Sequence, residues 1–178
     1  MPPPPPSAVA PTGLSPAPAV GQDEFFEAAL EGREEVVDRA IKAGFNVNTP
    51  GPEGRTALML ASFNGHAALV RRLLGAGAQV GAKDGIGRTA LMYASTGPAA
   101  DTVRVLLDAG ADVNIIDGNE KWSALMFAAA EGHLDVVRLL LSRGADRSLR
   151  DVDGDRAEEF AANNGHTAVV EVLQKPGR

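Results

Sequence analysis

Three aspartates near the end of the chain have the spacing of a calcium-binding loop. The segment DVDGDRAEE places Asp151, Asp153 and Asp155 at alternate positions, as in the loop of an EF-hand. The rest of that pattern fails, because Arg156 stands where glycine is required and Ala162 stands where a bidentate glutamate is required. The same residues also fit the tip of a turn between two helices. We therefore expect a structural turn here, with a calcium site as the alternative.

The three histidines could act as a general base or as metal ligands only if they converged in space. Each of them follows a glycine in the same local pattern: His66, His133 and His166. If that pattern marks successive structural units, the rings lie about one unit apart. The chain has no cysteine, and no motif places a serine beside a histidine. We expect structural histidines, no catalytic residue, no metal and no cofactor.

A methionine also recurs at one position of the same pattern, as Met59, Met92 and Met126. A row of thioethers could bind a soft metal ion. These positions flank leucines at helical spacing, however, and methionine fills irregular gaps in hydrophobic cores well. We therefore predict that the three methionines pack between structural units.

The segments that carry these residues repeat with a period of about 33 residues. The copies read GRTALMLASFNGH from Gly54, GRTALMYASTGPA from Gly87, KWSALMFAAAEGH from Lys121 and, more weakly, GDRAEEFAANNGH from Gly154. Self-similarity at a fixed period of this length is typical of stacked repeat architectures, in which each unit buries its apolar face against the next.

Each copy carries the signals of two short helices. Residues able to cap a first helix precede the apolar runs, at Asp23, Thr56, Thr89 and Ser123. Glycines that can turn the chain back end the first helix, at Gly32, Gly65, Gly132 and Gly165. Further glycines end a second, leucine-rich helix, at Gly44, Gly77, Gly110 and Gly144. Neither helix is long enough to be stable alone, so the units must stabilise one another.

These copies resemble ankyrin repeats, whose pattern runs Gly-x-Thr-Pro-Leu-His-x-Ala-Ala, then Gly-His, Leu-Leu and Gly-Ala-Asp-Val-Asn. The resemblance covers about residues 22 to 175 and implies an all-α solenoid of helix-turn-helix units with β-hairpin loops. It also implies a concave face made of hairpin tips and first helices. The implied domain, residues 23–175, has five units, of which the outer two are caps: 23–53, 54–86, 87–120, 121–153 and 154–175.

The chain departs from the family pattern at several positions. Ala-Leu-Met replaces Pro-Leu-His in three units, so we expect thioether packing in place of the hydrogen bonds that this histidine makes in the family. Pro98-Ala99 replaces Gly-His in the third unit. Glu158 and Glu159 stand where leucine and methionine occur in other units, which suits the polar outer face of a terminal cap.

The first 22 residues differ in composition from the rest of the chain. They hold eight of the twelve prolines and no charged side chain. We expect a disordered, partly polyproline-II arm that acts as a spacer. The alternative is a ligand for a proline-binding module.

Charge and hydropathy exclude two classes of partner. The net charge is −6 and no cluster of Lys and Arg appears, which argues against a nucleic-acid ligand. No apolar stretch approaches the roughly 18 residues that span a bilayer, and no secretory signal follows Met1. We expect a cytoplasmic monomer. An exported protein whose leader has been removed is the alternative.

The implied concave face is the candidate binding site. The family positions put Arg55, Ile86, Arg88 and Trp122 at or beside hairpin tips, with Ile115 and Ile116 on the longest hairpin. They put Phe63, Thr96, Glu131 and Asn163 at the exposed ends of first helices, and Tyr93 and Phe127 beside the methionines. Exposed aromatic and Arg side chains on a rigid surface are typical of interaction hot spots. The alternative is that Tyr93 and Phe127 pack between units and that Trp122 covers its own hairpin.

The sequence therefore predicts a protein-binding module that catalyses no reaction. The expected contact residues are Arg55, Phe63, Ile86, Arg88, Tyr93, Trp122, Phe127 and Glu131. Mild acidity in the later units predicts a partner with some basic surface there. An inhibitor or immunity protein that blocks an enzyme with the same face is one alternative. A metal-dependent or small-molecule enzyme is another, and it would require a polar pocket with converging ionisable groups.

Overall fold

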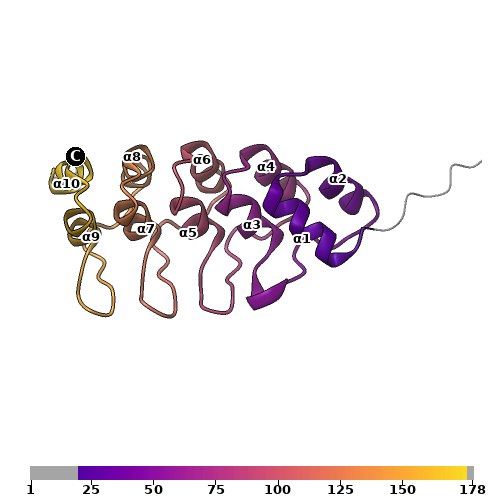
Figure 1. Ribbon diagram of the computed structural model, residues 1–178, viewed down its shortest axis with the longest axis horizontal. Helices are drawn as coiled ribbons and strands as arrows, with labels where there is room; N and C mark the ends of the chain where they lie inside the picture. Colours follow the sequence, from indigo (N-terminus) through magenta and orange to yellow (C-terminus); the bar gives the residue numbers. More distant parts are fainter. Residues whose placement is uncertain (1–19, 176–178) are drawn as a thin grey trace, which may run out of the picture.

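The computed structural model describes residues 20–175, which form a row of five helix pairs (Figure 1). The helices are α1 (Gln22–Glu31), α2 (Glu34–Lys42), α3 (Ala57–Phe63), α4 (Ala67–Gly75), α5 (Ala90–Ser95), α6 (Ala100–Asp108), α7 (Ala124–Ala130), α8 (Leu134–Ser142), α9 (Ala157–Asn163) and α10 (Thr167–Gln174). This confirms the all-α class. Residues 1–19 of the predicted arm lie outside the described residues, and α1 already includes Gln22.

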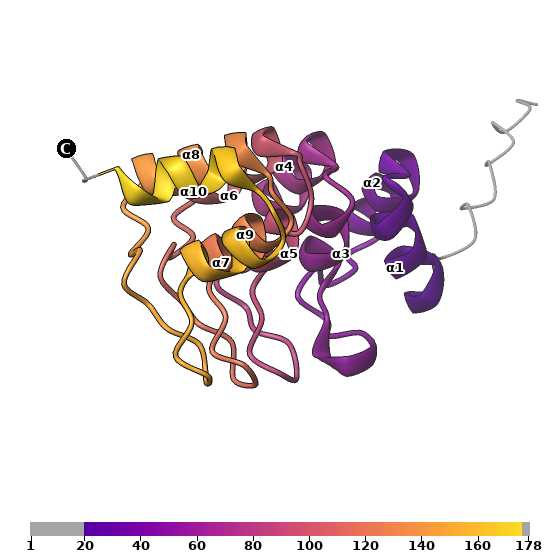
Figure 2. The same cartoon turned by 60° about the vertical axis from the view of Figure 1, so that its left-hand side comes forward.

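The helices form two layers, with four long loops projecting to one side (Figure 2). The first helix of each pair lies in the layer nearer the loops, and the second helix lies in the other layer. Loops 1 to 4 connect α2 to α3, α4 to α5, α6 to α7 and α8 to α9. No helix within residues 20–175 has the length and apolarity needed to cross a membrane.

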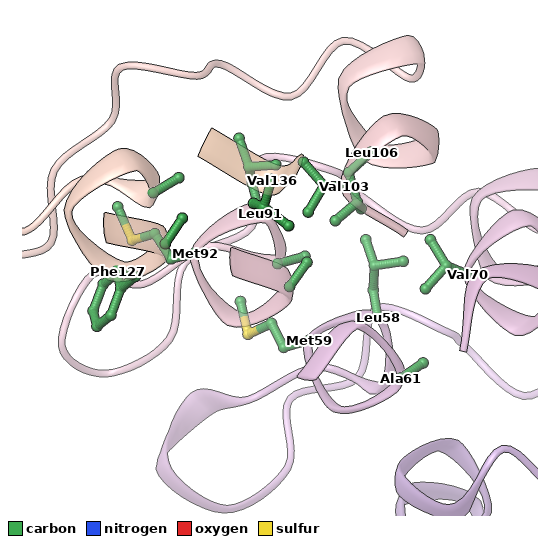
Figure 3. Close-up of a cluster of buried hydrophobic side chains, with 14 of the residues drawn as sticks. Leu58, Met59, Ala61, Val70, Leu91, Met92, Val103, Leu106, Phe127 and Val136 are labelled. Atoms are coloured by element: carbon green, nitrogen blue, oxygen red, sulfur yellow. The ribbon is translucent and has the colours of Figure 1, made fainter. Parts of the chain in front are cut away.

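One continuous hydrophobic core runs along the row between the two layers. Figure 3 shows how neighbouring pairs share it, with Leu58 and Val70 of the second pair facing Val103 and Leu106 of the third. Small residues in the first helices, such as the fully buried Ala61, let adjacent helices approach closely. Each pair is therefore stabilised mainly by its neighbours.

The methionines do more than fill space in two of the first helices. The hydroxyl of Thr56 accepts the backbone N–H of Met59, and the Sδ atom of Met59 accepts the backbone N–H of Thr56 at 3.4 Å. Ser123 and Met126 form the same reciprocal cap. We expected packing alone to replace the histidine of the family pattern. That expectation is incomplete, because the thioether sulfur also accepts a hydrogen bond.

One of the predicted helix caps is wrong, and another has the predicted position without the predicted hydrogen bond. Thr89 precedes α5 as expected but makes no side-chain capping hydrogen bond. Asp23 lies inside the first turn of α1, and Gly21 occupies the N-cap position. The helix therefore begins two residues earlier than predicted, and the Asp23 carboxylate in its first turn still interacts favourably with the positive end of the helix dipole.

The loops follow a hairpin course, but the described residues contain no β-strand. A single isolated bridge joins Ile116 to Ser123 in loop 3. Each of loops 2 to 4 is instead held by an aspartate that accepts backbone N–H groups of its own turn. In loop 4 the Oδ1 atom of Asp151 accepts from Asp153 and Asp155, at 3.0 and 2.8 Å. The aspartate pattern is therefore structural, as the repeat register predicts.

Backbone contacts also connect the loop tips to one another. The N–H groups of Gly85, Gly118 and Val152 donate to carbonyls of the preceding loop, at 2.8, 2.7 and 3.1 Å. Gly87 allows this approach in loop 2, because it adopts a φ of 83° and an added Cβ would lie 2.8 Å from the nitrogen of Gly118. The tips therefore form a connected row instead of four independent loops.

Side chains connect most neighbouring helix pairs as well. We number the junctions between successive pairs 1 to 4, starting at α1. The three histidine rings place Nε2 beside a carbonyl of the preceding pair: His66 at Leu30, His133 at Thr96 and His166 at Ala130, at 2.9, 3.1 and 3.0 Å. The rings thus bridge junctions 1, 3 and 4, which is the structural role predicted for them.

Candidate protein-binding face

The surface between the loop tips and the loop-facing side of the first helices, which we call the inner face, contains two pockets. Three of the large apolar side chains exposed in the described part of the chain, Ile86, Ile116 and Val152, lie in loops, and a fourth, Phe63, ends α3. Backbone hydrogen bonds hold the loops, so the three loop side chains are already in place before a partner binds.

A pocket of about 410 Å³ brings together four of the predicted contact residues. Arg55, Ile86, Arg88 and Tyr93 line it, together with Glu53, Asp84 and Gly85. Loops 1 and 2 supply its two side walls, and Tyr93 comes from α5. Ile86 is 45% exposed at the rim.

Tyr93 and Asp84 form the polar floor of this pocket. The Tyr93 hydroxyl donates to Oδ2 of Asp84 at 2.7 Å. Burial, and secondarily this hydrogen bond, raise the pKa of Tyr93 to about 12. The phenol therefore stays protonated at neutral pH, where it acts as a hydrogen-bonding group and not as a base.

Arg55 separates this pocket from a second one of about 210 Å³. The second pocket is lined by Phe26, Glu27, Leu30, Pro52, Arg55 and Leu60. Its lining is mostly apolar, and α1, loop 1 and α3 contribute to it. Sequence reasoning missed this pocket. The repeat register could have indicated it, because Leu60 occupies the same repeat position as Tyr93, which was among the predicted contact residues.

The Trp122 side chain is half-buried rather than free. Its ring lies 5.0 Å from that of Phe127 and 4.4 Å from that of Phe160, measured between centroids. Trp122 therefore connects loop 3 with α7 and α9. Sequence reasoning missed Phe160, which follows Tyr93 and Phe127 in the same repeat position.

Phe127 requires a correction as a predicted contact residue. Its side chain is only 8% exposed, and the Arg88 guanidinium lies 4.9 Å above its ring. The Nε atom of Arg88 also donates to Oδ2 of the buried Asp117 at 3.2 Å. Phe127 is therefore a packing residue that supports Arg88 from below, and a partner on the inner face would meet Arg88 first.

The other predicted contact residues are spread along the row. Phe63 is 49% exposed and packs edge-on against Tyr93, with 6.2 Å between centroids. Glu131 and Asn163 are exposed at the ends of α7 and α9, away from the pocket. Thr96 is half-buried, and its hydroxyl donates to the carbonyl of Tyr93. Ile115 is also half-buried.

The larger pocket has ionisable groups but no arrangement for proton transfer. Asp84 is committed to its own turn and to Tyr93, and Arg55 forms an ion pair with Glu53. Within residues 20–175 no three His, Asp or Glu side chains are grouped so that they could hold a metal ion. The geometry suits recognition by hydrogen bonds and apolar contact.

Comparison with known proteins agrees with the repeat architecture. A family model described as ankyrin repeats (3 copies) matches residues 25–117 and 114–178. A comparison with curated protein sequences found no match. The family match covers nearly the whole chain. It agrees with the five stacked helix pairs, with the glycines that end the helices and with the histidines that bridge to the preceding pair. The chain belongs to the ankyrin repeat family.

Proposed function

We propose that this protein binds a partner protein on the inner face and catalyses no reaction of its own. Ankyrin repeats are typically protein-binding modules and are generally non-catalytic. The observation that carries the proposal is the pair of pockets on either side of Arg55, which offers polar and apolar contacts side by side.

The rigidity of the loops supports this proposal. Their aspartates and the hydrogen bonds between their tips hold the inner face in one arrangement before a partner arrives. Binding to such a surface loses little conformational entropy on the side of this chain. Arg55 is of a type enriched among interface hot spots, and the exposed side chains of Ile86 and Phe63 add apolar surface.

The test is affinity capture from a lysate of the source cells with matched variants. The double variant Arg55→Ala, Ile86→Ala removes two inner-face anchors, whereas Arg71→Ala removes an exposed guanidinium on α4, in the layer away from the loops. We expect the double variant to lose partners that the wild type and Arg71→Ala retain. Equal retention by all three proteins would refute the choice of face.

The inhibitor alternative needs one further measurement. If the captured partner is an enzyme, its activity is compared with and without an excess of this protein. If the wild-type protein lowers the partner's activity and the double variant does not, the protein is an inhibitor. If the activity is unchanged, the protein is a scaffold.

A further inference from the structure

We propose that the two pockets beside Arg55 recognise an extended peptide segment of the partner in which an acidic and an apolar side chain lie about three residues apart. This inference rests on the proposed function and specifies the chemistry of the partner. The acidic side chain enters the larger pocket between loops 1 and 2, and the apolar side chain enters the smaller pocket between α1 and α3.

The acceptors of the larger pocket are already used. Oδ1 of Asp84 accepts the backbone N–H groups of Ile86 and Arg88, at 3.0 and 2.8 Å. Oδ2 of Asp84 accepts the Tyr93 hydroxyl. Asp117, behind Arg88, accepts from two backbone N–H groups of loop 3 and from Arg88 itself. A ligand therefore finds few free acceptors in this pocket.

Donors, in contrast, remain free. A guanidinium carries five N–H donors, but Arg55 donates only through Nη2 to Glu53, and its Nε is buried without a hydrogen-bond partner in the described chain. Arg88 donates through Nε to Asp117, which leaves its terminal nitrogens for a ligand. Two guanidinium groups with free donors at one pocket match a carboxylate, which can accept two parallel hydrogen bonds from arginine.

Glu53 does not close the pocket to an acidic ligand. Its side chain is 71% exposed, so its ion pair with Arg55 is weak and can be exchanged for a ligand carboxylate. The net charge of −6 acts over longer distances, and salt screens it beyond roughly 8 to 10 Å. Within the lining itself the charges of Arg55 and Arg88 balance those of Glu53 and Asp84, so the free N–H donors, which need acceptors, select the ligand group.

The smaller pocket supplies the apolar half of the recognition. The ring of Phe26 and the side chains of Leu30, Leu60 and Pro52 form its walls, and Arg55 forms the rim that it shares with the larger pocket. Burying an apolar side chain here removes its surface from water, with a gain of about 25 cal/mol per Å².

The spacing between the two side chains follows from the stack. Packed helices lie about 8 to 10 Å apart, and an extended chain advances about 3.3 Å per residue, so one repeat corresponds to about three peptide residues. The arginine at this repeat position does not recur in the next unit. Trp122 stands at the repeat position of Arg55 and Arg88, and its ring packs against Phe160 there.

A random linear-peptide library displayed on phage, selected against the full-length chain, tests this inference. We expect the selected peptides to be enriched in Asp or Glu about three positions from Leu, Ile, Met or Phe. The best peptide is then synthesised, and its affinity is measured by fluorescence anisotropy for the wild type, Arg55→Gln and Arg71→Gln. Circular dichroism establishes that both variants are folded.

The expected result is a double-mutant cycle centred on the carboxylate. Arg55→Gln weakens binding about tenfold or more, and replacement of the peptide's acid by its amide weakens binding to the wild type similarly. The amide peptide loses little further affinity for Arg55→Gln, and Arg71→Gln binds like the wild type. This coupling identifies the acid that Arg55 contacts.

Three outcomes would overturn the inference. The library could yield no binder, the selected peptides could lack acidic enrichment, or acidic peptides could bind Arg55→Gln as tightly as the wild type. The proposed function fails separately, when lysate capture is insensitive to the Arg55→Ala, Ile86→Ala variant. Peptides that lose affinity for Ile86→Ala but show no acidic preference would overturn only the inference.

Discussion

Junctions 1 and 2 join equivalent helix pairs in different ways. At junction 1 the side chains of His66 and Asn64 both reach the carbonyl of Leu30, at 2.9 and 2.7 Å. Asn48 bridges the bases of loops 1 and 2 by donating to Gly77 at 2.9 Å and accepting from Gln79 at 2.8 Å. Arg72 of α4 pairs with Glu34 and Asp38 of α2. Polar side chains thus connect every level of this junction.

Junction 2 lacks each of these connections. The residues at the corresponding repeat positions are Gly97, Ala99 and Gly81 in place of Asn64, His66 and Asn48. No ion pair connects α4 to α6 within the described residues. What remains is apolar packing in the core, the contact between the Phe63 and Tyr93 rings and, at the loop tips, the backbone hydrogen bond from Gly85 to Glu53.

The difference shows that cohesion is unevenly distributed along a repeat stack. Each pair touches only its neighbours, so a junction with fewer polar side-chain contacts cannot be compensated by a distant one. The larger pocket lies on loops 1 and 2 and on α5, at the tip side of junction 2. The junction with the fewest polar side-chain bridges therefore carries the more polar part of the proposed binding surface.

Truncating the core at junction 2 should have the largest effect. Leu58 of α3, which faces Val103 and Leu106 of the third pair, is 2% exposed, and Leu58→Ala should lower the free energy of unfolding by about 2 to 5 kcal/mol. Because apolar contact is most of what joins the pairs here, we also expect α1–α4 and α5–α10 to unfold in separate steps.

The matched control is Leu91→Ala in α5, which has the same repeat position at junction 3 and is similarly buried, at 1% exposed. It should cost a similar amount but leave one cooperative transition, because junction 3 keeps His133 and the Arg143–Asp108 pair. Urea unfolding followed by far-ultraviolet circular dichroism measures both. Identical single transitions for the two variants would contradict the comparison.

Restoring the missing asparagine should strengthen junction 2. By analogy with Asn48 and Asn114, Gly81→Asn would donate to the carbonyl of Gly110 and accept from the N–H of Asp112. An added Cβ at Gly81 meets nothing within 4 Å. We expect a gain of about 1 to 3 kcal/mol, from two hydrogen bonds and a less flexible unfolded chain.

Gly81→Ala separates these two causes. It keeps the entropic gain of about 0.4 to 1 kcal/mol and adds no hydrogen bond. Chemical unfolding of both variants gives the difference. If Gly81→Asn is no more stable than Gly81→Ala, the side-chain bridge does not form and loop cohesion has another origin.

Restoring the missing histidine should have a smaller effect. Ala99 lies over Gly65 as His66 lies over Gly32, and the carbonyl of Phe63 stands where Leu30 accepts. We expect Ala99→His to stabilise the protein by about 0.5 to 1.5 kcal/mol through this hydrogen bond. Ala99→Phe supplies a ring without a donor, so a gain shared equally by both variants would assign the effect to packing.

The smallest effect concerns pH at the tip of junction 2. The pKa of Tyr93 is about 12 in the folded protein, above the ordinary value near 10. The folded state therefore holds this proton more tightly than the unfolded state, and the resulting stability is complete below pH 10 and is lost between pH 10 and pH 12. Tyr93→Phe should remove this part of the pH dependence. The chain's single tyrosine can be titrated directly by its absorbance near 295 nm.

The repeat pattern predicts the fold well because the signals are local. Glycines and apolar spacing within each copy determine where helices end, and the copies agree with one another. Asp23 misled because it has the repeat position of the caps Thr56 and Ser123, whereas α1 begins two residues earlier in the register, after Gly21. The absence of β-strands from residues 20–175 was also not predictable, since turns held by side chains such as Asp84 replace the hydrogen-bonded ladder.

The candidate site was predictable residue by residue but not as a shape. Arg55, Ile86, Arg88 and Tyr93 were all identified, and they line one pocket. The exposure of Trp122 and Phe127 was not predictable, because it depends on Phe160 one unit later and on the guanidinium of Arg88. Such contacts join different units, so a pattern within one copy does not contain them.

The chain's one tryptophan and one tyrosine stand at different places in the stack. Trp122 is enclosed by Phe127 and Phe160 where the last two helix pairs meet, whereas Tyr93 touches Phe63 where the second and third pairs meet. The protein therefore carries two natural optical reporters. Selective excitation of the indole follows melting of the C-terminal end alone, while phenol absorbance follows the middle of the row, with no added label.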